Sequence, residues 1–297
     1  MNSTLSKSFL SDKLVSVLIP AYNEENAIIK TIKDLESALS RSGWGYEIIV
    51  VDDSSTDGTA QAAKTTGVRV LSHPKNIGYG GALRTGIENA SYEWVATIDA
   101  DCSYPAEELL KLFPFADKHD MVVGARQGKH YWGTLLKYPA RILFLAIAQF
   151  VVGKKIPDVN SGLRLMKKSI VTEMLPRLSR GFSFSTTITL SFLSSFRFVH
   201  FEPIVYSSRV GSSKVRYIRD TLRTLQLMLE TIVYYNPIKA GVLLMFLPMI
   251  SGATCLVISL VKSQPSLLLW SLGFFCGAQV FLAMGLLMFV ILQKKSG

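Results

Sequence analysis

Three short apolar runs near the start of the chain have the pattern of buried β-strands, and each one ends at a cluster of polar residues. Apolar residues at positions 82, 83, 87 and 90 have helical spacing instead, after a glycine-rich turn at 76–81. Strands that alternate with helices predict an α/β domain with an open, mostly parallel sheet. The three runs are VSVLI at 15–19, YEIIVV at 46–51 and WVATI at 94–98.

Two much longer apolar runs lie in the C-terminal part of the chain. Residues 240–261 and 267–292 contain no charged side chain, and the polar segment KSQPS at 262–266 separates them. A helix needs about 20 apolar residues to cross a bilayer, so the pattern predicts a transmembrane hairpin. Two buried helices of a soluble core are the alternative, although glycine and proline inside both runs are typical of membrane helices.

Two further segments have the pattern of surface helices. Apolar residues at 218, 222, 225, 229 and 232 recur at helical spacing with polar residues between them. We interpret this segment as an amphipathic helix in the membrane interface that leads into the hairpin, with a soluble helix packed on the domain as the alternative. Residues 142–152 are apolar but too short to cross a bilayer. They are interpreted as a second interfacial helix, with a core helix as the alternative.

The composition and charge fit a membrane-associated protein. Hydrophobic residues make up 49% of the 297 positions, and the formal net charge is +10. Basic residues concentrate at 209–223, directly before the apolar runs, which favours lipid headgroups or phosphates over nucleic acid as partners. Basic residues also flank the hairpin on both sides, so the positive-inside rule predicts that both termini and the N-terminal domain are cytosolic. The three cysteines are too few and too scattered for a disulfide framework or a zinc site.

The strongest candidate for chemistry is the pair of carboxylates Asp99 and Asp101, at the end of the third apolar run. Two carboxylates at this spacing can reach one cation, and Mg²⁺ or Mn²⁺ takes few protein carboxylates when substrate phosphates complete its shell. An acidic triplet in a solvated loop is the alternative. Glu24 follows the first run, and Asp52 and Asp53 follow the second. Ligands of open α/β sheets bind beyond the carboxyl ends of the strands, so we expect these acids to face one crevice.

The same region argues against a nicotinamide-binding unit. Its fingerprint places G-x-G-x-x-G directly after the first strand, where this chain has PAYNEE at 20–25. The glycine-rich turn at 76–81 comes later, Leu83 stands where the third glycine should be, and the sequence has no Walker A loop. The turn is better explained as the start of the following helix.

The order of these motifs resembles family 2 glycosyltransferases of the GT-A fold, specifically polyprenyl-phosphate sugar transferases of the dolichyl-phosphate mannose synthase kind. The resemblance implies a GT-A nucleotide-diphospho-sugar transferase domain over 1–210 and a juxtamembrane interfacial helix over 211–236. A transmembrane hairpin over 237–297 follows, with spans at about 240–261 and 267–292. The matching motifs are PAYNEE (20–25), VDDSSTDGT (51–59), NIGYG (76–80), DAD (99–101), VGAR (123–126), DVNSGLR (158–164) and RVGSSK (209–214).

The resemblance also implies a role for each matching residue. The family's usual further metal ligand, a glutamine, is replaced here by Ser103, whose shorter hydroxyl is a weaker ligand. The metal, Mg²⁺ or Mn²⁺, would bind Asp99, Asp101 and Ser103. The UDP- or GDP-linked donor would be held by Pro20, Tyr22, Glu24, Asp52, Asp53, Asp99, Ala100 and Asp101. The phosphates of donor and acceptor would meet Arg126, Arg164, Arg209 and Lys214.

The implied reaction transfers a hexose or related sugar to a polyprenyl phosphate, undecaprenyl or dolichyl, with inversion at the anomeric carbon, at the cytosolic face of the membrane. Because a phosphate acceptor is already anionic, positioning and the metal would carry catalysis. The expected catalytic residues are Asp99, Asp101, Arg126 and Asp158. Transfer to a sugar or lipid hydroxyl is an alternative that would need a general base, for which Asp158 is the candidate. A non-catalytic membrane scaffold is another, and the sequence leaves the sugar, the carrier lipid and self-association open.

Overall fold

The computed structural model describes residues 13–127, 138–179, 181, 183–208, 226, 230 and 232–296. The chain divides into two compact units. One unit comprises the positions up to Gln149 together with Lys154–Leu225, and it contains the sheet. The other comprises Phe150–Gly153 and Gln226–Gly297, and it contains the long C-terminal helices.

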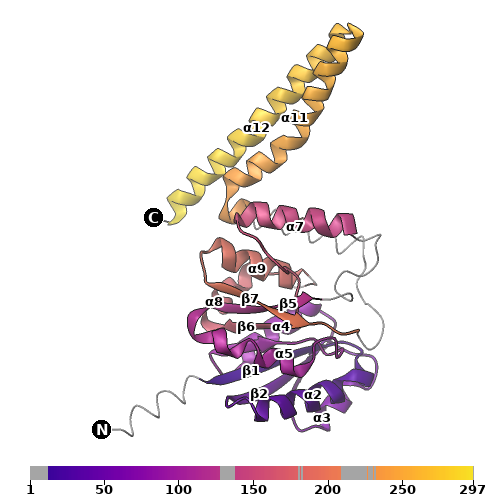
Figure 1. The fold of residues 1–297 in the computed structure, drawn as a ribbon, viewed down its shortest axis with the longest axis vertical. Helices are drawn as coiled ribbons and strands as arrows, with labels where there is room; N and C mark the ends of the chain where they lie inside the picture. The colour runs from indigo at the N-terminus through magenta and orange to yellow at the C-terminus, as the bar shows by residue number, and fades with distance from the viewer. Residues whose placement is uncertain are drawn as a thin grey trace, which may run out of the picture. The chain divides into compact units, whose positions relative to one another are not determined.

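A seven-stranded sheet is the framework of the first unit (Figure 1). The strand β6 runs antiparallel to both of its neighbours, whereas the other paired strands are parallel. The predicted open, mixed and mostly parallel sheet is therefore confirmed, and the three apolar runs form β1, β2 and β4. In sheet order the strands are β3 (Arg69–Ser72), β2 (Gly45–Asp52), β1 (Leu14–Ala21), β4 (Trp94–Thr97), β6 (Arg164–Lys167), β5 (Met121–Gln127) and β7 (Val199–Val205).

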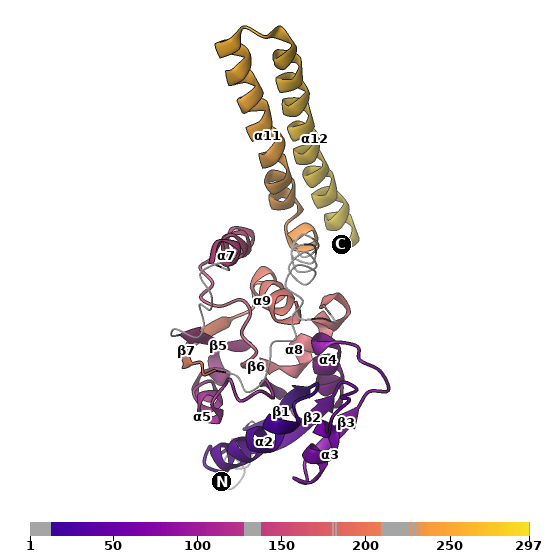
Figure 2. The ribbon, with the colours of Figure 1, turned by 90° about the vertical axis from the view of Figure 1, so that its right-hand side faces the viewer.

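Helices connect the strands of the sheet (Figures 1 and 2). The glycine-rich turn leads into α4, as predicted. Gly78, immediately before this helix, has a φ of +93°, a conformation that favours glycine. The helices of this unit are α2 (Glu25–Ser40), α3 (Thr59–Lys64), α4 (Tyr79–Asn89), α5 (Ala106–Leu110), α8 (Lys168–Met174), α9 (Phe184–Ser194) and the part of α7 (Tyr138–Val152) up to Gln149, with 3₁₀ turns at Phe113–Lys118 and Leu175–Arg177.

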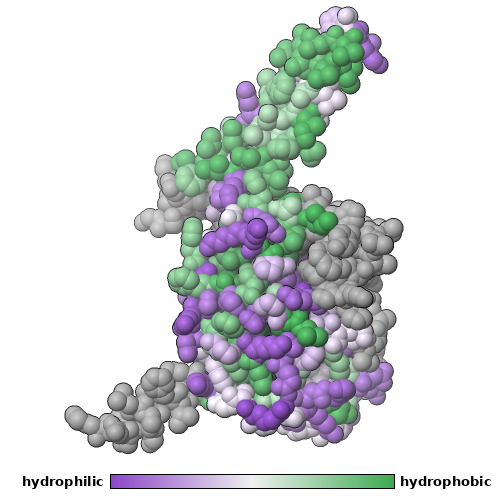
Figure 3. Space-filling model, viewed as in Figure 1, coloured by the Kyte–Doolittle hydropathy of each residue, from purple (hydrophilic) through white to green (hydrophobic). Residues whose placement is uncertain are grey.

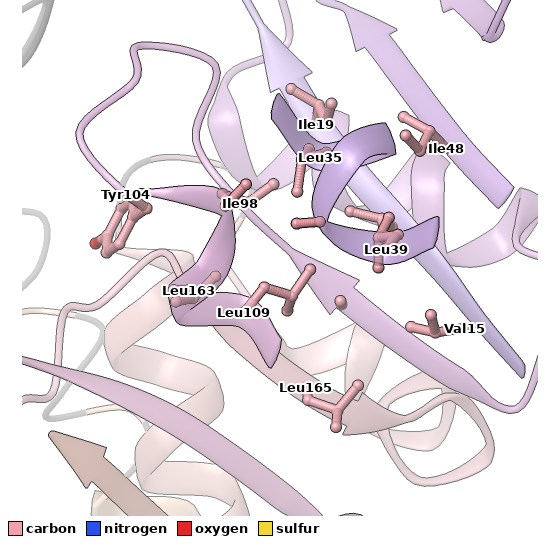
Figure 4. Packing of buried hydrophobic residues seen from close by; sticks show 14 of the residues in the cluster. Val15, Ile19, Leu35, Leu39, Ile48, Ile98, Tyr104, Leu109, Leu163 and Leu165 are labelled. Carbon is pink, nitrogen blue, oxygen red and sulfur yellow. The ribbon is translucent and has the colours of Figure 1, made fainter. Parts of the chain in front are cut away.

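The two faces of the sheet have separate cores, because side chains alternate along each strand. Val15 and Ile19 of β1 belong to the cluster that α2 covers with Leu35 and Leu39, as Figure 4 shows. Leu18 belongs to the other cluster, to which α4, α8 and α9 contribute. Burial on both faces accounts for the continuous apolar runs that predicted these strands.

The apolar segment at 142–152 lies within α7, so a helix is confirmed there. Ile142 and Phe150 are exposed, and Ala148 is buried. The place of this helix in a membrane interface stays a prediction. The amphipathic helix expected within 211–236 lies mostly outside the described residues.

Two long helices dominate the second unit, α11 (Pro237–Lys262) and α12 (Pro265–Ser296) (Figure 2). Both are long and apolar enough to cross a membrane, and the two predicted spans lie within them. Figure 3 shows their visible surface as mostly hydrophobic. The helices approach closely at Gly241 and Gly285, since a Cβ on Gly285 would lie 2.7 Å from the carbonyl oxygen of Pro237.

Candidate active site

The candidate site lies where β1, β2 and β4 end. The three strands are parallel neighbours whose register pairs Ala21 with Asp52, so their carboxyl ends meet at one edge of the sheet. After each strand one residue has a left-handed backbone, namely Asn23 (φ +54°), Ser54 (φ +63°) and Cys102 (φ +58°). Such a backbone costs about 1–2 kcal/mol per non-glycine residue and is concentrated at functional sites. The three turns therefore mark this edge as a candidate for ligand binding.

The exits of β1 and β2 are hydrogen-bonded to each other. The backbone N–H of Asn23 donates to Ser55 Oγ at 2.9 Å, and that of Glu24 donates to Thr59 Oγ1 at 2.8 Å. Asp57 accepts from the backbone N–H of Thr59 at 3.0 Å, at the start of α3. Burial acts to raise the pKa of Asp57, but hydrogen bonds from Thr59 outweigh it and leave this pKa below its usual range. Two neighbouring loops thus share one rigid arrangement.

Asp52, the last residue of β2, is only 4% exposed. Its Oδ2 accepts one long hydrogen bond from the N–H of Ser55 at 3.4 Å, whereas its buried Oδ1 has no partner among the described residues. A buried carboxylate oxygen is costly to leave unpaired, so Asp52 is suited to accept a hydrogen bond from a ligand. Of the other residues expected at the donor, Tyr22 and Glu24 are half-buried at the β1 exit, Pro20 is buried near the end of β1, and Ala100 is buried in the turn after β4.

Asp53 has a different environment from the one that the resemblance implies. Its Oδ1 accepts from the N–H of Ile77 at 2.9 Å and lies 2.7 Å from His73 Nδ1. Its Oδ2 accepts from the N–H of Gly78 at 2.7 Å. Both carboxylate oxygens therefore anchor the loop before α4, while the adjacent Asp52 keeps an unpaired oxygen. The four histidines have no ligand spacing in the sequence and are interpreted as structural or surface residues, which gives no sign of the contact between His73 and Asp53.

Asp99 and Asp101 lie at the exit of β4 and are both partly exposed. Asp99 Oδ1 accepts a hydrogen bond from the Tyr79 hydroxyl at 2.9 Å. Gly162 packs against the same carboxylate, since a Cβ there would lie 2.7 Å from both of its oxygens. Burial and the nearby charge of Asp99 raise the pKa of Tyr79 well above its usual value, which keeps its hydroxyl a donor. Two carboxylates held in this way suit a hard divalent cation.

Ser103, expected as a further metal ligand, contacts Asp101. It is fully buried, and its hydroxyl donates to Asp101 Oδ1 at 2.5 Å while its N–H donates to the same oxygen at 3.1 Å. Ser103 therefore orients Asp101 in this structure, and its role as a metal ligand stays a prediction. In the part of the chain that the structure describes, no group of three or more His, Cys, Asp or Glu side chains is arranged to hold a metal ion.

Arg126 and Asp158 form a bidentate ion pair. Arg126 Nε lies 2.6 Å from Asp158 Oδ2, and Nη2 lies 2.9 Å from Oδ1. The N–H of Asn160 also donates to Oδ1 at 3.0 Å. Burial acts to lower the pKa of Arg126, but Tyr104 and Asp158 outweigh it and raise this pKa well above its usual value. A permanently charged guanidinium is thus held in one orientation by a buried carboxylate.

Arg164, which was expected on a phosphate, is a core residue instead. It is 1% exposed, and its guanidinium donates to the backbone oxygens of Ser161, Val159 and Ser185 at 2.9, 3.2 and 2.9 Å. Burial lowers its pKa to about 10. These contacts tie the DVNSGLR segment to α9 and leave no exposed surface for a phosphate, which corrects the expectation.

Arg209 and Lys214, the other two residues expected to bind phosphate, lie outside the described residues. Their role in binding stays a prediction.

Residues 16–175 match the family described as Glycosyl transferase family 2. One similar protein is an undecaprenyl-phosphate 4-deoxy-4-formamido-L-arabinose transferase of Pseudomonas fluorescens, 31% identical over 226 residues, or 73% of this chain and 64% of that protein. A protein of the same name from Klebsiella pneumoniae is 29% identical over 293 residues, or 93% of this chain and 87% of that protein. A third, from Pseudomonas aeruginosa, is matched over 54% of its length. The chain thus covers less than two thirds of the first and the third of these relatives.

Solved structures of a glucosyl-3-phosphoglycerate synthase from Mycobacterium tuberculosis have a similar fold. The complex with Mg²⁺ and UDP has a TM-score of 0.63 at 20% identity, covering 77% of this chain and 83% of that one. The complex with Mn²⁺, UDP and glucosyl-3-phosphoglycerate has a TM-score of 0.60 at 20% identity, covering 74% and 80%. At this identity the likeness concerns the fold, a GT-A-like mixed sheet.

Proposed function

Because the chain belongs to glycosyl transferase family 2, we propose that it transfers a sugar from a nucleotide diphosphate to the phosphate of a polyprenyl lipid. Relatives named for undecaprenyl phosphate support this acceptor, and a similar fold crystallised with UDP supports a nucleotide-sugar donor. The observation that carries the proposal is the presence, in one chain, of a carboxylate-lined strand edge and two apolar helices of membrane-spanning length.

The nucleotide would bind at the exits of β1 and β2. Asp52 offers a buried, unpaired oxygen to a ring N–H of the base, and Tyr22 and Glu24 lie on the adjoining exit. Uracil and guanine both carry such an N–H, so Asp52 suits either UDP or GDP.

Asp99 and Asp101 would hold Mg²⁺ or Mn²⁺ together with the donor diphosphate. When bound, the cation neutralises charge that develops on the departing diphosphate. Tyr79 and Ser103 fix the two carboxylates beforehand through their hydrogen bonds. Groups that are oriented in advance stabilise developing charge without reorganising during the reaction.

The acceptor phosphate would attack the anomeric carbon opposite the departing diphosphate, so that the configuration inverts. A phosphate is anionic near neutral pH, and the reaction therefore needs no strong general base. Arg126 would face a phosphate of donor or acceptor, and Asp158 would keep its guanidinium oriented. Arg209 and Lys214 would add positive charge for the lipid phosphate.

Transfer to a sugar or lipid hydroxyl is the second candidate, with Asp158 as its base. The pairing of Asp158 with Arg126 and its exposure of 1% argue against this function, because a general base must reach the hydroxyl whose proton it accepts. A non-catalytic scaffold fits less well than either transferase, because it gives no reason for the orphaned oxygen of Asp52.

We place the sugar transfer at the cytosolic face of a membrane. Basic residues at 209–223 and 294–295 flank the hairpin, whereas its turn carries only Lys262. The positive-inside rule then puts both ends of the hairpin, and the domain before it, in the cytosol.

The test is an acceptor screen with purified protein in detergent. UDP- and GDP-sugars are offered with undecaprenyl or dolichyl phosphate and Mn²⁺, and the sugar should appear on the lipid phosphate. The matched control acceptor is the same polyprenol without its phosphate. Transfer to the free alcohol at a comparable rate would favour the hydroxyl-acceptor function, and no turnover of any donor would favour the scaffold.

A further inference from the structure

A series of partly buried polar contacts connects the exit of β3 to the candidate metal site, and it begins at His73. The ring Nδ1 of His73 lies 2.7 Å from Asp53 Oδ1, and Nε2 lies 2.9 Å from the Thr85 hydroxyl. An ionised carboxylate only accepts hydrogen bonds, so Nδ1 carries a proton and donates it to this contact. A hydroxyl can donate or accept, so Thr85 satisfies Nε2 without opposing that assignment.

Asp53, which contacts His73, also forms hydrogen bonds with the loop at 76–78. Its two carboxylate oxygens accept from the N–H groups of Ile77 and Gly78, and its carbonyl oxygen accepts from Asn76 Nδ2 at 3.2 Å. Gly78 has a φ of +93°, which glycine adopts without strain, and these hydrogen bonds hold the loop in that path. The orientation of Asp53 therefore sets where α4 begins.

Tyr79, the first residue of α4, connects the loop to the acids. Its buried hydroxyl donates to Asp99 Oδ1 at 2.9 Å, and Gly162 closes on the same carboxylate. A displacement of the loop would move Tyr79, and Asp99 would lose a donor that sets its orientation.

We propose that His73 and Tyr79 are positioning residues for Asp99. In this assignment His73 orients Asp53, Asp53 fixes the loop at 76–78, and Tyr79 holds Asp99 for a divalent cation. The assignment rests on the proposed function. In it Asp53 anchors the loop at 76–78 and does not bind the nucleotide. Asp52, which is proposed to bind the base, makes none of these contacts. Binding of the base should therefore not depend on His73 or Tyr79.

The first test removes only the Tyr79 hydroxyl. Tyr79→Phe should bind Mn²⁺ in the presence of UDP or GDP about ten- to one-hundred-fold more weakly, since a hydrogen bond to a charged group is lost. Free Mn²⁺ measured by electron paramagnetic resonance reports this without turnover. Tyr92→Phe is the matched control, because it also removes one tyrosine hydroxyl but lies just before the start of β4, away from the acids that follow its end. Unchanged Mn²⁺ affinity in Tyr79→Phe would overturn the assignment.

The second test separates the two contacts of His73. An asparagine amide nitrogen falls near the place of Nδ1, and a glutamine amide nitrogen falls near that of Nε2. His73→Asn should therefore keep Mn²⁺ affinity within a few-fold, whereas His73→Gln should lose about ten-fold. His119→Gln, at a histidine that contacts the Phe115 carbonyl instead, is the control. Equal affinity in the two His73 variants would contradict the role of the Asp53 contact.

Failure of this assignment can be distinguished from failure of the proposed function. Asp101→Asn should weaken Mn²⁺ binding and slow sugar transfer, each by roughly 10²-fold or more, if the metal lies at the β4 exit. If it does, while Tyr79→Phe and His73→Gln behave as the unaltered protein, only the assignment fails. If Asp101→Asn keeps both, the metal site of the proposed function is wrong. Should His73→Gln not fold, Tyr79→Phe still decides the matter.

Discussion

At the scale of single residues, the site consists of carboxylates that other side chains hold in place. Tyr79 donates to Asp99, and Ser103 donates to Asp101. Asp52 is the exception, since its buried Oδ1 has no hydrogen-bond partner in the part of the chain that the structure describes. A carboxylate oriented before the ligand arrives needs no rearrangement during the reaction, whereas an unpaired one gains most when the ligand binds.

The charge of Asp101 should be indispensable for transfer. Asp101→Asn keeps the shape of the side chain but removes the negative charge that attracts the cation. We expect kcat to fall by roughly 10²-fold or more, because charge stabilisation at the diphosphate is lost. Sugar transfer at saturating Mn²⁺ measures the loss, and an unchanged thermal unfolding midpoint shows that the fold survives. Near-normal activity in metal-free buffer would contradict the placement of the metal.

The carboxylate of Asp52 should be needed for donor binding but not for the stability of the fold. Asp52→Asn removes a buried carboxylate of which one oxygen has no partner among the described residues, so the unfolding midpoint should stay the same or rise. Donor KM should rise about ten- to one-hundred-fold, because a charge-assisted hydrogen bond to the base becomes a neutral one or is lost. Asp34→Asn, at an exposed pair with Lys30, is the control. A variant with normal donor KM would remove Asp52 from the nucleotide site.

At the scale of elements, the patterns that predicted correctly are those set by local burial. The strands β1, β2 and β4 are covered on both faces along most of their length, so their sequences are mostly apolar, and the hairpin follows from uninterrupted apolar length. Arg164 and Ser103 could not be placed in this way. Arg164 is satisfied by partners that the fold brings together, such as the Ser185 carbonyl from α9, whereas Ser103 donates to Asp101 two residues away through a turn that no apolar pattern encodes. The antiparallel insertion of β6 between β4 and β5 also depends on long-range pairing that no local pattern encodes.

Close packing of α11 on α12 should depend on Gly285 more than on Gly277. A Cβ at Gly285 would lie 2.7 Å from the Pro237 carbonyl oxygen, whereas one at Gly277 would meet nothing within 4 Å. Gly285→Ala should therefore destabilise the hairpin by about 1–3 kcal/mol, and Gly277→Ala should be neutral. Thermal unfolding in detergent, followed by the circular dichroism of the helices, compares the two. Equal midpoints would show that the helices can separate slightly at no cost.

At the scale of the whole molecule, the chain combines a globular sheet domain with a hairpin of membrane-spanning length. A polyprenyl phosphate has its phosphate at the membrane surface and its chain in the bilayer, so an enzyme that acts on it gains from being anchored there. The basic residues on either side of the hairpin predict which surface that is.

The topology can be tested with single cysteines in a background without Cys102, Cys255 and Cys276. A cysteine at Ser263, in the turn of the hairpin, should react with a membrane-impermeant thiol reagent added to intact cells. One at Ser296 should react only after the cells are permeabilised. Both expectations follow from the basic bias on the two sides of the hairpin. The reverse labelling pattern would place the sheet domain outside the cytosol.

The left-handed turns after β1, β2 and β4 have a consequence for how this protein could evolve. Asn23, Ser54 and Cys102 together cost the folded chain a few kcal/mol, which is a sizeable part of the roughly 5–15 kcal/mol that stabilises a typical domain. A chain selected only for resistance to heat would be expected to relax these positions first. The strained backbone at these three residues helps only if it places ligand-binding groups at the edge of the sheet. Substitutions that relax it should therefore raise the thermal stability of the protein but slow its turnover.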